Sequence, residues 1–166
     1  MIFSTLGTNP CGFTRLVEAL DRYSLENHED IVIQLGYTAY KPKNLNFFSF
    51  IGQAKMRGYI KSAEIVITHG GYGCIYDCLE LKKKVIAVPR KRELKECYDP
   101  GFGQEELIHK LEQENRIVAL DDVKELASAI GKARNFSPNF ELTNEIAVFL
   151  ADWFLHARYR PARARL

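Results

Sequence analysis

The chain has 166 residues, of which 46% are hydrophobic and 27% are charged, and its formal net charge at pH 7 is +2. A single domain of this length buries about two-thirds of its unfolded surface. No apolar run reaches the about 18 to 20 residues of a membrane span. The start MIFSTLGTNP lacks a signal-peptide pattern, so we expect a cytosolic chain. The last ten residues hold four arginines and no acid, so the rest is mildly acidic, which argues against nucleic acid as a partner.

Short β-rich segments alternate with amphipathic stretches along the chain. Strands are predicted at residues 2–6, 30–36, 47–51, 64–68, 84–89 and 116–120. Helices are predicted at residues 13–23, 53–62, 74–81, 104–114, 123–133 and 141 to about 157. This alternation is typical of an α/β fold with a doubly wound, mostly parallel sheet and right-handed crossovers. Ligands of such sheets bind at the carboxyl ends of the strands.

The first predicted strand runs into the loop Gly7-Thr-Asn-Pro-Cys-Gly12, and a helix opening with Phe13 follows. The backbone N–H groups of such a loop and the dipole of the next helix point at one spot, which suits an anion. The loop matches neither the GxGxxG dinucleotide fingerprint nor the Walker A loop. A purely structural turn explains it equally well.

The fourth predicted strand ends in ITHGGYGCIYD, residues 67–77, which leads into another helix. Gly70, Gly71 and Gly73 allow a ligand to approach the backbone closely, so two such loops at one edge suggest a diphosphate. Asp77 is expected near the start of the helix, where it either accepts the hydroxyls of a ribose or interacts with the helix dipole. His69 either donates to a phosphate or sugar oxygen or simply caps the loop.

The sequence predicts no metal site and no general base. The four cysteines form no CxxC pair, so we expect reduced thiols rather than zinc ligands. A DxD pair is absent from the sequence, and the nearest acidic pair, Asp121-Asp122, is expected to cap the last short helix. The other histidines are interpreted as surface residues: His28, His109 and His156.

Four blocks of the sequence, covering about residues 1 to 120, match a known pattern in order: IFSTLGTNPCGFTRLVEALD, IVIQLGYTAYKPKN, SAEIVITHGGYGCIYDCLELKKKVIAVPR and GQEEL. They resemble the C-terminal, donor-binding domain of family 28 glycosyltransferases. The free-standing form of that domain occurs in two-subunit enzymes such as the dolichol-linked UDP-GlcNAc transferase and bacterial capsular galactosyltransferases. Two positions depart from the family: Asp77 stands where glutamate is usual, and Gly103 stands where a histidine usually precedes Gln104.

The resemblance implies a Rossmann-like half of an inverting GT-B glycosyltransferase. Such a chain binds the UDP-sugar, while a membrane-anchored partner supplies the site for a lipid-linked saccharide acceptor and the catalytic base. No cofactor or metal is implied, and we expect a peripheral position at the cytosolic face of the membrane. The implied donor site comprises Gly7, Thr8, Asn9, His69, Gly70, Gly71, Tyr72, Gly73, Asp77, Pro89, Arg90, Gln104 and Glu105.

Two other functions remain open. The departures at Asp77 and Gly103 favour a non-catalytic module that enhances or recruits a partner glycosyltransferase. A self-sufficient homodimer, in which one copy contributes the acceptor side, is the third hypothesis.

We divide the chain into a UDP-sugar-binding domain, residues 1–140, and a C-terminal helix with a basic tail, residues 141–166. Residues 146–160, IAVFLADWFLHARYR, are apolar on most of the helix circumference, which indicates packing against the domain itself or against a partner. The resemblance implies contact with the partner subunit through Leu150, Trp153 and Phe154. The terminal arginines either reach acidic lipid headgroups or form a solvated tail.

Overall fold

Parallel strands form the centre of the molecule in the computed structural model, which describes residues 1–98 and 104–140. The strands in these residues are β1 (Ile2–Thr5), β2 (Ile31–Gln34), β3 (Asn46–Phe48), β4 (Ile65–Thr68), β5 (Lys84–Ala87) and β6 (Val118–Ala119). They pair in the order β3-β2-β1-β4-β5-β6, and every pairing is parallel. This confirms the predicted doubly wound α/β fold.

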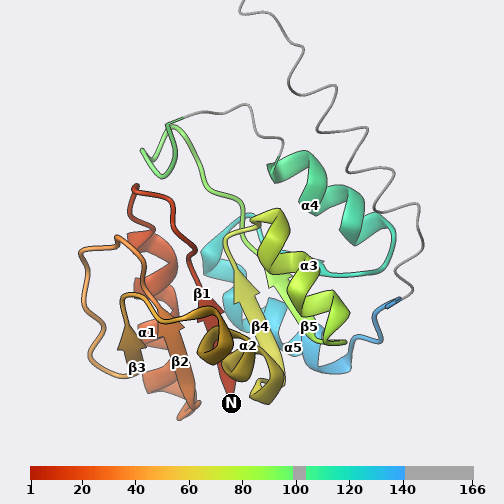
Figure 1. Ribbon diagram of the computed structural model, residues 1–166, viewed down its shortest axis with the longest axis horizontal. Helices are drawn as coiled ribbons and strands as arrows, with labels where there is room; N and C mark the ends of the chain where they lie inside the picture. The colour runs from red at the N-terminus through yellow and green to blue at the C-terminus, as the bar shows by residue number, and fades with distance from the viewer. Residues whose placement is uncertain (99–103, 141–166) are drawn as a thin grey trace, which may run out of the picture.

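Helices cover both faces of the sheet (Figure 1). One face carries α1 (Thr14–Asn27) and α5 (Leu126–Asn135), whereas α2 (Gln53–Ser62), α3 (Tyr72–Glu80) and α4 (Gln104–Gln113) lie over the other. Among the described residues no helix is both long enough and apolar enough to cross a membrane.

The central strands are buried on both sides, which is why they read as continuous apolar runs in the sequence. Successive side chains of a strand point to opposite faces. In β1, Ile2 therefore belongs to the hydrophobic cluster under α1 and α5, and Phe3 belongs to the cluster under α2, α3 and α4. Each cluster is completed by apolar side chains from the helices on its face.

The connections change direction between β1 and β4. From β1 the chain moves outward through α1 to β2 and then β3, and α2 brings it back to β4 on the other side of β1. Neighbouring strands whose connections leave in opposite directions form a topological switch point, where open α/β sheets bind their ligands. The loops after β1 and β4, the two glycine-bearing loops of the sequence, are the ones that flank this point.

Element boundaries differ from the prediction in several places; α1, for example, continues to Asn27 instead of ending at residue 23. Strand β6 is reduced to Val118–Ala119, and the helix expected at residues 123–133 begins with a 3-10 turn, Val123–Glu125, before α5. Helix α3 begins at Tyr72, two residues early, because Gly71 takes the extended conformation of an N-cap residue. Asp77 consequently lies in the second turn of α3, further from the helix start than the sequence suggested. The predicted last helix, with Leu150, Trp153 and Phe154, lies outside the described residues.

Candidate functional site

The two glycine-bearing loops meet on the imidazole of His69. A Cβ atom on Gly7 would lie 2.4 Å from Cε1 of His69, and a Cβ atom on Gly71 would lie 2.4 Å from its Nε2. Gly7 also has a φ of +69°, a conformation that favours glycine. The ring therefore sits between the two backbones, and any larger residue at either glycine would displace it.

Helix α4 packs against the loop after β4. Gly70 has a φ of +79°, and a Cβ atom there would lie 2.5 Å from Cδ1 of Ile108 in α4. The absence of a side chain at Gly70 thus lets α4 approach the loop after β4. This contact fixes where the first turn of α4, with Gln104 and Glu105, lies relative to the switch point.

His69 is neutral at physiological pH. Burial of the ring, together with the positive charge of Arg90, lowers the pKa of His69 to about 4. Its Nδ1 lies 3.4 Å from the carbonyl oxygen of Thr5, which can only accept, so this geometry favours a proton on Nδ1 and a lone pair on Nε2. In that tautomer Nε2 can only accept a hydrogen bond, whereas the sequence suggested either a donor to a phosphate or sugar oxygen or a cap of the loop.

Gln34 at the end of β2 holds the first loop in place. Its Nε2 donates to the carbonyl oxygens of Gly7 and Ser49, both at 3.0 Å, and its Oε1 accepts from the Gly7 amide at 3.0 Å and from the Thr5 hydroxyl at 2.8 Å. The sequence analysis missed this residue. The sequence does give a sign of it, because Gln34 is the single polar residue in the apolar run IVIQL. In the structure Gln34 is buried, with 2% of its surface exposed.

The Gly7 amide is therefore already paired, and the rest of the loop supplies the remaining candidates for contact with an anion. Thr8 is exposed, and Oδ1 of Asn9 accepts from the Cys11 amide at 2.9 Å, which closes a local turn. The amide of Phe13, at the start of α1, donates to the Thr38 hydroxyl at 3.0 Å. These bonds present the loop and the N-terminus of α1 at the switch point.

Helix α3 presents its N-terminus at the same edge of the sheet. Within the described residues no side chain caps it, and its first turn contains no acid. The first N–H groups of a helix have no intrahelical acceptor, so that of Gly73 is suited to an anion. Gly73 is exposed, and a Cβ atom there would meet nothing within 4 Å.

Arg90, a predicted donor contact, points inward instead. Its Nη1 donates to the carbonyl oxygens of Cys11, Gly12 and Glu96 at 2.9–3.2 Å, and its Nη2 donates to that of Leu6 at 2.9 Å. The guanidinium also stacks over the Phe13 ring, 4.6 Å from its centroid. Arg90 thereby ties the first loop to the segment after β5, and it shapes the site rather than facing it.

Pro89 has a similar supporting place. Its carbonyl oxygen accepts from Nη2 of Arg15 at 2.6 Å, and Nε of Arg15 donates to Glu96 at 2.8 Å. The buried Glu96 also accepts from the Lys91 amide at 2.8 Å. Arg15 of α1 therefore holds the segment after β5.

Asp77 is already paired with a cation. Its Oδ1 accepts from Nη1 of Arg57 at 3.0 Å, and Glu80, one turn further along α3, accepts from Nη2 of the same arginine at 2.9 Å. The Asp77 side chain keeps 34% of its surface exposed. A ribose that bound here would share the carboxylate with Arg57.

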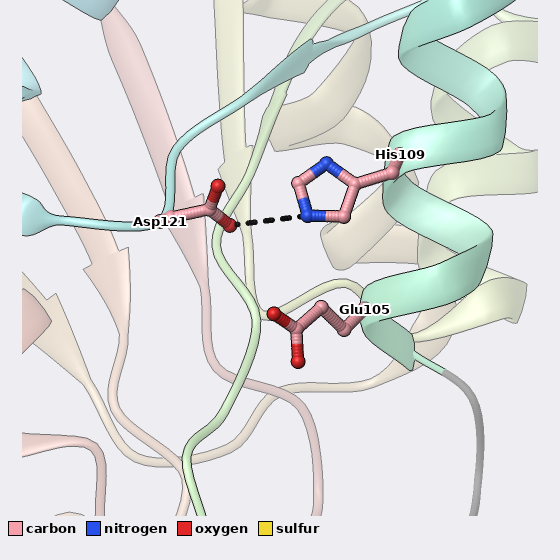
Figure 2. Close-up of side chains that lie close together, drawn as sticks. All are labelled: Glu105, His109 and Asp121. Carbon is pink, nitrogen blue, oxygen red and sulfur yellow. Dashed lines mark ion pairs between the residues drawn. The ribbon is translucent and has the colours of Figure 1, made fainter.

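Gln104 and Glu105 begin α4, but Glu105 belongs to a second cluster (Figure 2). Its carboxylate turns toward His109 and Asp121. Asp122, not Asp121, caps the 3-10 turn, because its Oδ1 accepts from the Lys124 amide at 3.0 Å. The sequence analysis missed this cluster because β6 separates Asp121 from α4, and only the packing of α4 beside β6 brings their side chains together.

Solved structures share this fold. The solution NMR structure of ALG13 matches with a TM-score of 0.59 and 14% identity, over 90% of this chain and 93% of that one. The calicheamicin glycosyltransferase CalG4 matches with a TM-score of 0.60 and 13% identity, over 94% of this chain and 38% of that one. At these identities the likeness shows the fold alone.

A third similar structure is UDP-GlcNAc 2-epimerase from Methanocaldococcus jannaschii in complex with UDP-GlcNAc and UDP. It matches with a TM-score of 0.60 and 14% identity, over 91% of this chain and 45% of that one. The chain thus spans less than half the length of the epimerase and of CalG4. It corresponds in fold to the Rossmann-like half of a GT-B glycosyltransferase.

The comparison with sequences gives the family. Among curated proteins no sequence matches the chain. The model of the family described as glycosyltransferase family 28 C-terminal domain matches residues 11–137, well over half of the chain. This match confirms the resemblance drawn from the four sequence blocks, and the chain therefore belongs to the glycosyltransferase family 28 C-terminal domain family.

Proposed function

We propose that this chain is the donor-binding subunit of a heteromeric, membrane-associated, inverting glycosyltransferase. It binds a UDP-sugar, and a membrane-anchored partner supplies the acceptor site and the catalytic base. The product is a lipid-linked saccharide extended by a hexose or an N-acetylhexosamine. The observation that carries the proposal is the meeting of two glycine loops on His69 at the topological switch point, where open α/β sheets bind ligands.

The likeness to ALG13 supports a free-standing donor subunit. The chain covers 93% of ALG13 and 38% of CalG4, so it corresponds to nearly all of the first and to one part of the second. In the proposed enzyme the acceptor half belongs to another polypeptide, which would keep this subunit peripheral at the cytosolic face of the membrane. UDP-sugar is the proposed donor class because the similar epimerase fold is solved with UDP-GlcNAc and UDP.

In the proposed reaction, the acceptor hydroxyl attacks the anomeric carbon while UDP leaves, so negative charge develops on the diphosphate. The N-termini of α1 and α3 flank the switch point and supply preorganised N–H donors for that charge. This arrangement requires no metal for the transfer step. The neutral His69 is suited to accept a hydrogen bond from the donor sugar and thereby to orient it.

Binding of the donor can be tested on the isolated chain. We expect UDP, UDP-GlcNAc, UDP-Gal and UDP-Glc, titrated in protein-observed NMR, to shift the amides of residues 7–12 and 69–77. The order of the affinities would identify the sugar. If none of the four nucleotides shifts these amides, the result contradicts the proposal for the isolated chain and favours the alternative below.

The ribose contact has a matched pair of variants, because Arg57 binds both Asp77 and Glu80. We expect Asp77→Ala to weaken UDP binding by about 1 to 3 kcal/mol, the loss of hydrogen bonds to a charged group. Glu80→Ala breaks the other arm of the same ion-pair network and should leave the UDP affinity unchanged. Weaker binding in Glu80→Ala alone would move the ribose contact to Glu80, and unchanged binding in both would remove the carboxylates from the site.

The alternative function is a non-catalytic module that enhances or recruits a partner glycosyltransferase. The engagement of the Gly7 amide, Arg90 and Asp77 within the chain favours it. Transfer activity measured with and without a membrane-anchored second polypeptide separates the hypotheses. Activity of this chain without that polypeptide would instead indicate a self-sufficient homodimer.

A further inference from the structure

Three side chains with metal-binding groups converge beside the start of α4 (Figure 2). Glu105 and His109 lie one turn apart on α4, and Asp121 follows β6. Each side chain offers one ligand atom, and these atoms all lie within 4.8 Å of one another. The cluster thus joins the first turns of α4 to the far edge of the sheet.

The spacing within the cluster is that of ligands rather than of a hydrogen bond. His109 Nε2 lies 3.6 Å from Asp121 Oδ1, which is too long for a well-formed hydrogen bond. Two ligands at about 2.1 Å from a tetrahedral Zn²⁺ are about 3.4 Å apart. A metal ion can therefore be inserted between these two groups with only a small movement.

The negative charges of Glu105 and Asp121 also favour a bound cation. Within residues 1–98 and 104–140, neither Glu105 nor Asp121 forms an ion pair with a lysine or an arginine. Other acids of this surface do have such partners, for example Glu112 with Lys132 at 3.0 Å. Two carboxylates and an imidazole meet here, and a divalent ion would offset the repulsion between the two carboxylates.

We propose that Glu105, His109 and Asp121 bind one divalent transition-metal ion. A set of one imidazole and two carboxylates favours Zn²⁺ over Mg²⁺, which prefers oxygen ligands alone, and over Cd²⁺ or Hg²⁺, which prefer sulfur. The side chains of His109 and Asp121 are 39% and 51% exposed, so the ion has access, and water completes its coordination. The ion pins the first turn of α4 to the end of β6.

This site shares one residue, Glu105, with the implied donor site, and Glu105 follows Gln104 in the first turn of α4. The other two ligands, His109 and Asp121, lie outside the implied donor site, and none of the three belongs to the two glycine loops. Binding of metal and binding of UDP can therefore be measured separately. If the chain binds no metal, the proposal of UDP binding is unaffected, and the converse also holds.

Titration of the full chain, prepared without a histidine tag, with ZnCl₂ in a calorimeter tests the proposal. We expect one ion per chain, and we expect His109→Gln to lower the affinity by about tenfold or more. Asp121→Asn, an exposed substitution that should not disturb folding, is expected to have a similar effect. His28→Asn is the control, because it removes an exposed histidine at a backbone position with φ 51° that asparagine tolerates.

The absorption spectrum of the Co²⁺-loaded chain identifies the ligand atoms. Nitrogen and oxygen ligands give weak visible bands, whereas cysteine ligands add an intense charge-transfer band in the near ultraviolet. The proposal is overturned if the wild-type chain binds no Zn²⁺ up to millimolar concentration, or if the thiolate band appears. It is equally overturned if His109→Gln and Asp121→Asn, shown by circular dichroism to be folded, bind as tightly as the wild type.

Discussion

Gly7 illustrates how strongly single residues constrain the switch point. Gly7→Ala places a Cβ atom 2.4 Å from the His69 ring at a φ of +69°, so we expect the free energy of unfolding to fall by about 1 to 3 kcal/mol. Gly131→Ala is the control, because a Cβ atom on this α5 residue meets nothing within 4 Å and should stabilise the helix by about 0.5 to 1 kcal/mol. Chemical denaturation measures both, and equal stability of Gly7→Ala and wild type would refute the close approach.

His69 makes stability depend on pH in a defined window. Its pKa is about 4 in the folded chain against 6.5 as the ordinary value, so below pH 6.5 the unfolded state binds a proton that the folded state does not. Stability should therefore fall as the pH is lowered from 6.5 to 4, by up to about 3 kcal/mol. Urea unfolding across this range should show a shallower dependence for His69→Gln. The same slope in both proteins would mean that His69 is not the group responsible.

At the scale of elements, Arg90 joins the loop after β1 to the segment after β5. Its guanidinium donates to the carbonyl oxygens of four residues, so Arg90→Met would leave these buried acceptors without a partner. We expect the free energy of unfolding to fall by about 2 to 4 kcal/mol, as measured by urea denaturation. The exposed Arg92 provides the control, since Arg92→Met should change stability by less than about 0.5 kcal/mol. Similar losses in the two variants would contradict a special role for Arg90.

The same elements show how the chain sets the distance between the two glycine loops. Gln34 holds the loop after β1 through Gly7 and also bonds the end of β3 through Ser49. His69 then fills the space between that loop and Gly71. The loops are thus positioned by neighbouring strands and not by their own sequence alone.

At the scale of the whole molecule, the described residues up to 140 supply a hydrophobic cluster on each face of the sheet. We therefore expect a chain truncated after residue 140 to keep the melting temperature and UDP affinity of the full chain. We also expect it to lose association with the membrane-anchored partner, because the predicted anchors Leu150, Trp153 and Phe154 are removed. Thermal unfolding, NMR titration and co-purification measure these three properties.

Two results would contradict that division of the chain. A truncated chain that fails to fold would show that residues 141–166 belong to the domain. A truncated chain that still binds the partner would place the interface elsewhere, and substitution of Trp153 by alanine in the full chain then provides the matched comparison.

Much of the fold could be predicted from local patterns. The apolar runs at β1 and β4, such as Ile65–Thr68, correctly predicted strands that are buried on both faces. Helix α2, Gln53–Ser62, was predicted with its observed bounds. The predicted ends of elements were less accurate where the backbone conformation of one residue sets the helix start, as at Gly71, the N-cap of α3. The glycine loops were identified correctly as neighbours, because carboxyl ends of parallel strands share one edge.

The sequence by itself determined the α/β alternation, the order of the loops and the family, because these follow from residue type and spacing along the chain. Only the tertiary structure decided which polar groups face the site. Arg90 bonds to Leu6, 84 residues away, and turns inward, while Asp121 turns to His109 across the end of the sheet. The direction of a polar side chain depends on acceptors and charges that folding brings together from distant positions, and local sequence patterns carry no record of those partners.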